Sequence, residues 1–214
     1  LFFNSTCIRV CILLKKKIYI FQDTISMKIE RSLFMAIVEP IRKKSDIQKI
    51  ERILAKQNTR DLLLFVTGTN CGLRISDILA LNVSDVRDKS HIQIIEKKTG
   101  KHKKFPINSK LKPMFQEFTK NKHPDEPLFV TIFGNRLDRV QAYRIIHAAC
   151  KQAGVEEKIG THTLRKTFGY HHYQKFKDVV ILQKIFNHST PQVTLRYIGI
   201  EQDKIDESYK NFIL

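Results

Sequence analysis

The sequence predicts an α+β domain that is mainly helical and carries one small antiparallel sheet. Three observations support this class. Apolar residues recur at helical spacing along most of the chain, as in SDIQKIERILAKQ (residues 45–57). One short region, residues 91–107, has two β-like segments around a Thr-Gly pair instead. With 214 residues, 42% of them hydrophobic and 28% charged, the chain has the composition of a globular domain.

The first part of the chain is expected to be helical. An amphipathic helix over residues 45–57 begins with serine as its N-cap. A more buried helix, RDLLLFVTGTNC (residues 60–71), ends at Gly72, because glycine readily takes the left-handed backbone that follows a helix. A short helix over residues 74–81 follows directly.

The middle of the chain then changes to β structure before helices return. Strands are expected over residues 91–98 and 101–107, and Thr99-Gly100 between them is typical of a two-residue hairpin turn. Helical periodicity returns after the hairpin and continues to the end of the chain. Helices are expected at residues 109–121, 138–153, 162–176 and 178–186, with one or two more over 190–211.

The charge balance bears on the partners of the protein. The chain holds 38 Lys and Arg residues against 21 Asp and Glu residues, which gives a net charge of +17. Such a surface suggests nucleic acid first and an anionic membrane second, although many basic proteins only carry solvated lysines. No stretch of about 20 apolar residues is present, so we expect no transmembrane helix.

The cysteines and acidic residues suggest neither disulfides nor a metal site. Cys7, Cys11, Cys71 and Cys150 form no CxxC pair and no regular framework. We interpret them as reduced thiols of a cytoplasmic protein and expect no zinc site. Because no cluster of Asp and Glu is evident either, we expect no catalytic metal.

The N-terminal segment has an unusual composition. Residues 1–26 contain no methionine, and their lysines at positions 15 to 17 follow the apolar run. A signal peptide would carry its positive charge before that run. We therefore expect the native start at Met27 and treat residues 1–39 as an N-terminal extension.

Two motifs hold arginines that could bind a phosphate. In THTLR, His162 and Arg165 lie three residues apart at an expected helix start, where an anion is favoured. In CGLRISD, Arg74 lies among apolar residues and needs a partner, either Asp77 or a bound anion. Taken alone, the first motif is hardly more frequent than chance and is explained by a surface histidine and a salt-bridged arginine. For the second motif alone, a structural Arg–Asp pair is the favoured explanation.

Two further motifs could supply chemistry. The hairpin KKTGKHKK carries five lysines around its turn, although lysines are also a common protection of an edge strand. In FNHSTPQVTLRY, His188 follows an expected helix end and Tyr197 follows nine residues later. Taken singly, this tyrosine is better explained as a packing residue than as a nucleophile.

In combination, these motifs resemble the tyrosine recombinase (phage integrase) family. That family carries an arginine in a G-L-R-[IV]-S-[ED] helix start, a hairpin lysine, H-x-x-R, a G-H-[ST] element, and a tyrosine nine residues after that histidine. This chain has GLRISD, KKTGK, HTLR, NHS and Tyr197 in the same order. The 23-residue interval from Arg165 to His188 also fits the family. The resemblance covers about residues 40–211, and Asn187 replaces the glycine that usually precedes the histidine.

The resemblance implies a domain organisation. Residues 40–214 would form a DNA breaking-rejoining catalytic domain, mainly helical, with a small antiparallel three-stranded sheet. The N-terminal DNA-clamping (core-binding) domain that most members carry would be absent. Asn187 should preserve the backbone of the usual glycine, because asparagine tolerates the left-handed conformation better than most residues.

The resemblance also assigns roles around the phosphate, without metal or cofactor. Tyr197 would attack the scissile phosphorus and form a 3′-phosphotyrosyl link, which conserves the energy of the phosphodiester. Arg74 and Arg165 would bind the non-bridging oxygens, since each guanidinium can donate two parallel hydrogen bonds. His188 would donate a hydrogen bond to the same phosphate.

Proton transfer would fall to other residues of the pattern. Lys98 would protonate the leaving 5′-oxygen, because it directly precedes Thr-Gly as in the K-T-G hairpins of the family. Lys97 and Lys101 stay open as rivals for this role. His162 would assist proton transfer to or from the tyrosine or the phosphate. Asp77 would orient the residues that contact the phosphate without contacting it itself.

The expected function is site-specific recombination or integration of double-stranded DNA for a mobile element. By resemblance, the active form would be a homotetramer on DNA in the cytoplasm, associated with the nucleoid and helped by accessory DNA-bending or directionality proteins. The C-terminal segment, residues 201–214, would dock on a neighbouring subunit or pack on its own domain. Two alternatives stay open: a type IB topoisomerase-like enzyme, and a non-catalytic DNA-binding remnant of an integrase.

Overall fold

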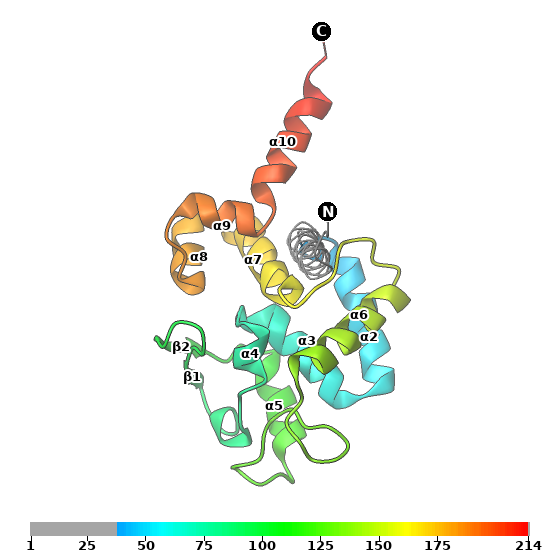
Figure 1. The fold of residues 1–214 in the computed structure, drawn as a ribbon, viewed down its shortest axis with the longest axis vertical. Helices are drawn as coiled ribbons and strands as arrows, with labels where there is room; N and C mark the ends of the chain where they lie inside the picture. The colour runs from blue at the N-terminus through cyan, green and yellow to red at the C-terminus, as the bar shows by residue number, and fades with distance from the viewer. Residues whose placement is uncertain (1–37, 214) are drawn as a thin grey trace, which may run out of the picture. The chain divides into compact units, whose positions relative to one another are not determined.

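The computed structural model describes residues 38–213 (Figure 1). Residues 1–37 and 214 lie outside the described residues, and with them Cys7, Cys11, the expected start at Met27 and nearly all of the expected extension. The described elements are the helices α2 (Lys44–Gln57), α3 (Thr59–Cys71), α4 (Ile75–Ile78), α5 (Leu111–Thr119), α6 (Arg139–Gln152), α7 (Thr163–Phe176), α8 (Val179–Phe186), α9 (Pro191–Tyr197) and α10 (Ile200–Asn211), a 3-10 turn at Val83–Asp85, and the strands β1 (His91–Ile95) and β2 (His102–Pro106).

The α+β class and most of the expected elements are confirmed, and several details differ. The sheet has two strands within the described residues, not three. The helix expected over 74–81 is the four-residue α4, because Arg74 has an extended backbone and the chain turns again directly after Leu79. The region 190–211 forms two helices that are separated at Gly199, whose φ is +82°.

The hairpin has a longer connection than the predicted two-residue turn. β1 and β2 are antiparallel and pair from His91 with Pro106 to Ile95 with His102. The connection spans residues 96–101, where the carbonyl of Glu96 accepts hydrogen bonds from the backbone N–H groups of Thr99 and Gly100. Thr99-Gly100 is therefore part of a six-residue loop that exposes several lysines.

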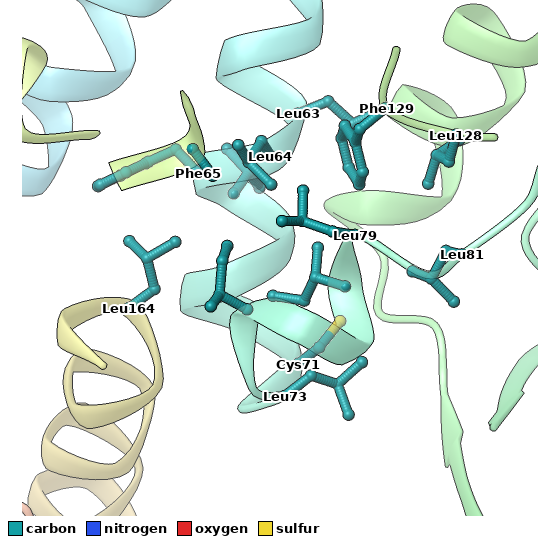
Figure 2. Close-up of a cluster of buried hydrophobic side chains, with 14 of the residues drawn as sticks. Leu63, Leu64, Phe65, Cys71, Leu73, Leu79, Leu81, Leu128, Phe129 and Leu164 are labelled. Carbon is teal, nitrogen blue, oxygen red and sulfur yellow. The ribbon is translucent and has the colours of Figure 1, made fainter. Parts of the chain in front are cut away.

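The main hydrophobic core surrounds α3. Leu63, Leu64 and Phe65 on this helix are at most 1% exposed, and they pack with buried side chains from other elements (Figure 2). Helix α3 packs mainly against α2, α5 and α7, and it also contacts α4 and α6. At the crossing with α7, a Cβ atom added to Gly68 would lie 2.8 Å from Cβ of Leu164. The absence of a side chain at Gly68 is therefore what allows the two helices to approach.

A second, smaller hydrophobic cluster lies among α7, α8 and α9. Its buried members are Leu182, Phe186, Ile198 and Ile200. Gly169 on α7 faces this cluster, because a Cβ atom there would come within 2.7 Å of both Phe186 and Ile198. Helix α7 thus packs against the main core at its beginning and against the second cluster further along.

The C-terminal helix α10 is fixed at its base and exposed beyond it. Arg42 donates hydrogen bonds from Nε and Nη2 to Oδ1 of Asp203, the latter at 3.0 Å. Further along, Tyr209 is 80% exposed and Phe212 69% exposed. None of the helices between residues 38 and 213 combines the length and the apolar character that a bilayer crossing requires.

The close crossing of α3 and α7 makes a prediction about stability. Gly68→Ala should improve helix propensity by about 1 kcal/mol, but overpacking against Leu164 should cost about 1–3 kcal/mol. We therefore expect a net loss in the free energy of unfolding, measured by urea denaturation.

The control is the same substitution in a Leu164→Ala background. That background removes Cδ1 and Cγ of Leu164, which would lie 2.3 and 3.1 Å from the new methyl group, and keeps Cβ at 2.8 Å. Gly68→Ala should therefore cost less there than in the wild type. An equal loss in both backgrounds would show that the crossing does not limit the size of residue 68.

Candidate active site

The first turn of α7 supplies the most buried cation of the site. Arg165 is only 3% exposed. Its Nη1 donates to the carbonyl of Gly72 at 2.7 Å, its Nη2 donates to the carbonyl of Phe186 at 2.8 Å, and its guanidinium lies 4.4 Å from the Phe186 ring centre. A guanidinium has five N–H donors, so these two bonds hold its plane and leave the others for a ligand.

Arg74 begins α4 and has a partner that the sequence did not reveal. Its Nη1 lies 2.9 Å from Oε2 of Glu96 and 4.0 Å from Oδ2 of Asp77. Both carboxylates are 2% exposed. Burial would raise the pKa of Glu96, but hydrogen bonds from Thr99 and Arg74 outweigh burial and lower it. By these distances, Glu96 is the nearer of the two carboxylate partners of Arg74.

Asp77 has a further contact that explains how it supports the site. Its Oδ1 accepts a hydrogen bond at 3.0 Å from the backbone N–H of Lys97. Helix α4 thus holds the start of the loop that carries Lys98. The side chain of Lys98 is exposed and makes no hydrogen bond or ion pair with the part of the chain that the structure describes. Lys97 is exposed too, whereas Nζ of Lys101 donates to Oδ1 of Asn187 at 3.0 Å.

Lys103 is a residue of the site that sequence reasoning missed. Its side chain is 15% exposed, and its Nζ donates to the carbonyl of Ile185 at 2.8 Å and lies 3.9 Å from Oε1 of Glu96. Burial and then the charge of Arg165 lower its pKa from 10.5 to about 8. Strand alternation places Lys103 on the same face of β2 as Phe105, but four basic residues in a row conceal that alternation in the sequence.

His188 follows the left-handed residue that ends α8. Asn187 has φ +55° and ψ +48°, as expected for a residue that replaces glycine there. The Nδ1 atom of His188 lies 3.1 Å from Oγ1 of Thr194, and the His188 and Tyr197 rings meet edge to face with centres 5.0 Å apart. Burial and then the charge of Arg165 lower the pKa of His188 to about 4, so the imidazole is neutral near pH 7.

Tyr197 and His162 face each other across the ends of α9 and α7. The tyrosine hydroxyl lies 3.4 Å from Nδ1 of His162. Burial raises the pKa of Tyr197, although the charge of Arg165 acts in the opposite direction. Burial, and then the charges of Arg165 and Lys166, lower the pKa of His162. A protonated phenol therefore lies beside a neutral imidazole, and a neutral imidazole can accept a proton.

The structure thus brings six of the seven proposed site residues into one connected set. Arg74 lies next to Asp77 and Glu96, and Glu96 lies next to Lys103. Arg165 donates to the carbonyl of Phe186 at the end of α8, just before His188. The His188 ring contacts Tyr197, whose hydroxyl lies beside His162. Lys98 lies on the loop of residues 96–101, and its side chain makes no hydrogen bond or ion pair within residues 38–213. Between residues 38 and 213, no group of three His, Cys, Asp or Glu side chains is placed to hold a metal ion, and Cys71 and Cys150 are buried free thiols.

Comparisons with known proteins agree with the order of these motifs. The model of the Phage integrase family matches residues 42–203. The probable integrase/recombinase YoeC of Bacillus subtilis is 49% identical over 179 residues, which are 83% of this chain and 98% of YoeC. The chain spans a smaller share, 51% to 64%, of several curated XerC and XerD recombinases.

Solved structures show the same fold at low identity. The crystal structure of XerA recombinase superposes with a TM-score of 0.66 at 20% identity and covers 81% of this chain and 63% of that one. XerH recombinase bound to its difH substrate after cleavage gives a TM-score of 0.59 at 20% identity, over 81% of this chain and 53% of that one. At these identities the likeness concerns the fold alone.

The position of Lys103 makes a prediction about pH dependence. Its folded pKa of about 8 lies below the ordinary 10.5, so the folded state disfavours the charged amine. This penalty is complete below pH 8 and disappears between pH 8 and 10.5, because the folded state then releases its proton first. Relative to Lys103→Met, the wild type should therefore gain about 3 kcal/mol of stability over that range, at about 1.4 kcal/mol per pKa unit.

The measurement is urea unfolding of both proteins at pH 7, 9 and 10.5. Lys104→Met removes an exposed lysine from the same strand and corrects for the general loss of one positive charge. A difference between wild type and Lys103→Met that does not change with pH would mean that this amine is solvated in the folded protein.

Proposed function

Because the chain belongs to the phage integrase family of tyrosine recombinases, we propose that it breaks and rejoins duplex DNA at specific sites through Tyr197. One observation carries the proposal. The hydroxyl of Tyr197 lies 3.4 Å from His162, and both side chains lie within the electrostatic reach of the buried Arg165. A nucleophile, a base and a phosphate-binding cation are therefore next to one another.

In the first half of the proposed reaction, the tyrosine oxygen attacks the scissile phosphorus. The phenol proton passes to the neutral His162 as the new O–P bond forms. Arg74 and Arg165 donate hydrogen bonds to the non-bridging oxygens, whose negative charge increases in the transition state. His188 donates to the same phosphate from its neutral imidazole.

The leaving group needs a proton, since a 5′-alkoxide is a strong base. Lys98 supplies it as the bond from phosphorus to the 5′-oxygen breaks, and a 5′-hydroxyl and a 3′-phosphotyrosyl link result. Attack by a second 5′-hydroxyl reverses each step, returns the proton to Lys98 and releases Tyr197. No high-energy nucleotide is consumed, because the tyrosyl ester keeps the energy of the original bond.

The proposed partner is double-stranded DNA. The net charge of +17 suits a polyanion and predicts an affinity that falls steeply with salt. XerH, whose fold this chain shares, was crystallised on its difH substrate. Beyond DNA binding, we propose a homotetramer on DNA, accessory DNA-bending or directionality proteins, and a location in the cytoplasm at the nucleoid. Residues 40–214 would be the catalytic domain, preceded by an extension.

The two alternatives make different predictions for the same site. A type IB topoisomerase-like enzyme would form the same tyrosyl link and relax supercoils without a recombinant product. A DNA-binding remnant would bind in a salt-sensitive manner without cleaving. The connected set around Arg165 and Tyr197 favours an active enzyme, since a remnant under no selection would be expected to lose at least one member.

Covalent trapping tests the proposed nucleophile. We would incubate the protein with nicked duplex fragments from its own genomic neighbourhood, denature it, and sequence any DNA that migrates with protein. The wild type should give a 3′ adduct, and Tyr197→Phe should give none. The variant should still fold, because the phenyl ring keeps the contacts of Tyr197 with Phe186 and His188.

Tyr209→Phe serves as the matched control, since Tyr209 is 80% exposed and should be dispensable for the adduct. An adduct that persists in Tyr197→Phe would move the nucleophile to another tyrosine. Salt-sensitive DNA binding without an adduct from the wild type would favour the remnant.

A further inference from the structure

Two lysines of the hairpin hold it against the end of α8. Nζ of Lys101 donates to Oδ1 of Asn187 at 3.0 Å, and Nζ of Lys103 donates to the carbonyl of Ile185 at 2.8 Å. The partners are more than 80 residues apart in the sequence. We call these two hydrogen bonds the hairpin clasp.

Asn187 contributes something to the clasp that glycine cannot. Its backbone is left-handed, and either glycine or asparagine can take this conformation. Only asparagine also offers a side-chain carbonyl, and that carbonyl accepts the bond from Lys101. Because Asn187 directly precedes His188, the clasp joins the hairpin to the turn that positions a proposed phosphate ligand.

The other end of the same loop is fixed independently. Oε2 of Glu96 accepts a hydrogen bond from the Thr99 hydroxyl at 2.7 Å and pairs with Arg74, while Asp77 accepts one from the backbone N–H of Lys97. The loop of residues 96–101 is thus held by α4 at its start and by α8 at its end. Lys98 lies between these two attachments, and its own exposed side chain adds no bond within the described chain.

We propose that Asn187 and Lys101 are positioning residues that hold the hairpin loop so that Lys98 meets the leaving 5′-oxygen. The inference rests on the proposed function, in which Lys98 is the proton donor. It assigns to the asparagine a role in catalysis that is separate from its role as a helix cap. Misplacement of a proton donor by about 1 Å can slow a reaction about a hundredfold, so one side-chain hydrogen bond at this point can matter.

The test uses Asn187→Gly, which keeps the left-handed backbone, leaves every charge in place and removes only the amide. The substrate is the duplex identified by trapping, made in two forms. One has the natural bridging 5′-oxygen, and the other has sulfur in its place. A thiolate leaves without being protonated, so the sulfur form makes the proton donor unnecessary while it requires the same attack by Tyr197.

With the oxygen substrate, Asn187→Gly should form the covalent adduct about tenfold to a hundredfold more slowly than the wild type. With the sulfur substrate, the two proteins should react at similar rates. Lys98→Ala should show the same pattern with a larger loss. Lys101→Met should resemble Asn187→Gly. The double variant should be no slower than either single variant, because both substitutions remove the same hydrogen bond.

Three results would overturn the proposal. If Asn187→Gly slows both substrates equally, the amide acts on attack or on phosphate binding instead. If it slows neither, the clasp has no role in catalysis. If Asn187→Gly slows the reaction with the oxygen substrate alone but Lys98→Ala does not, the proton donor is another residue. If the trapping experiment yields no adduct from the wild type with any duplex, the proposed function fails, and the proposed role of the hairpin clasp fails with it.

Discussion

The buried guanidinium of Arg165 is the contact on which the rest of the site depends. It donates to the carbonyl of Gly72 on one side and to that of Phe186 on the other. Gly72 ends the helix that comes just before Arg74, and Phe186 ends the helix that comes just before His188. Arg165 therefore links the chain segments that carry Arg74 and His188, the two side chains proposed to bind the phosphate beside it. Its loss would leave two carbonyls without their partner, at about 1–3 kcal/mol for each buried group.

Burial, and then the charge of Arg165, favour the neutral forms of the two histidines near it. Together with burial, its charge lowers the pKa of both His162 and His188, and that of His188 falls to about 4. A neutral histidine can accept a proton from the phenol of Tyr197, whereas a protonated one could not. Buried Glu96 offsets part of the positive charge, which allows Lys103 to lie in the same region. Burial and the charge of Arg165 thus act in the same direction on the pKa of both histidines.

Much of this arrangement was predictable from sequence, and the reasons differ between its parts. The order and spacing of the motifs indicated Arg74, Arg165, His188 and Tyr197, since those spacings reflect helix starts and turns that are local in the chain. The family is confirmed by comparison, while the roles of these residues stay predictions. Long-range contacts were not predictable in the same way. Nothing local to Glu96 reveals that it pairs with an arginine 22 positions earlier.

The hairpin was the part that sequence predicted least well. Thr-Gly is typical of a two-residue turn, but the carbonyl of Glu96 bonds two successive N–H groups and so extends the connection to residues 96–101. The sequence did not reveal that the Lys103 side chain points inward, because its neighbours in the strand are basic as well. Strand alternation is visible only where apolar and polar residues alternate. A segment of uniform charge conceals which of its members are buried.

The two halves of the site are held by different kinds of contact, and this difference bears on mechanism. Arg165 is held by backbone carbonyls and by the Phe186 ring, and His188 packs against that ring and Tyr197. Groups fixed in this way need no rearrangement when negative charge develops on a phosphate. The loop that carries Lys98 is attached instead by a few side-chain bonds at its two ends. In the proposed reaction, attack would therefore be the preorganised step, and protonation of the leaving group would be the step that movement of the hairpin can control.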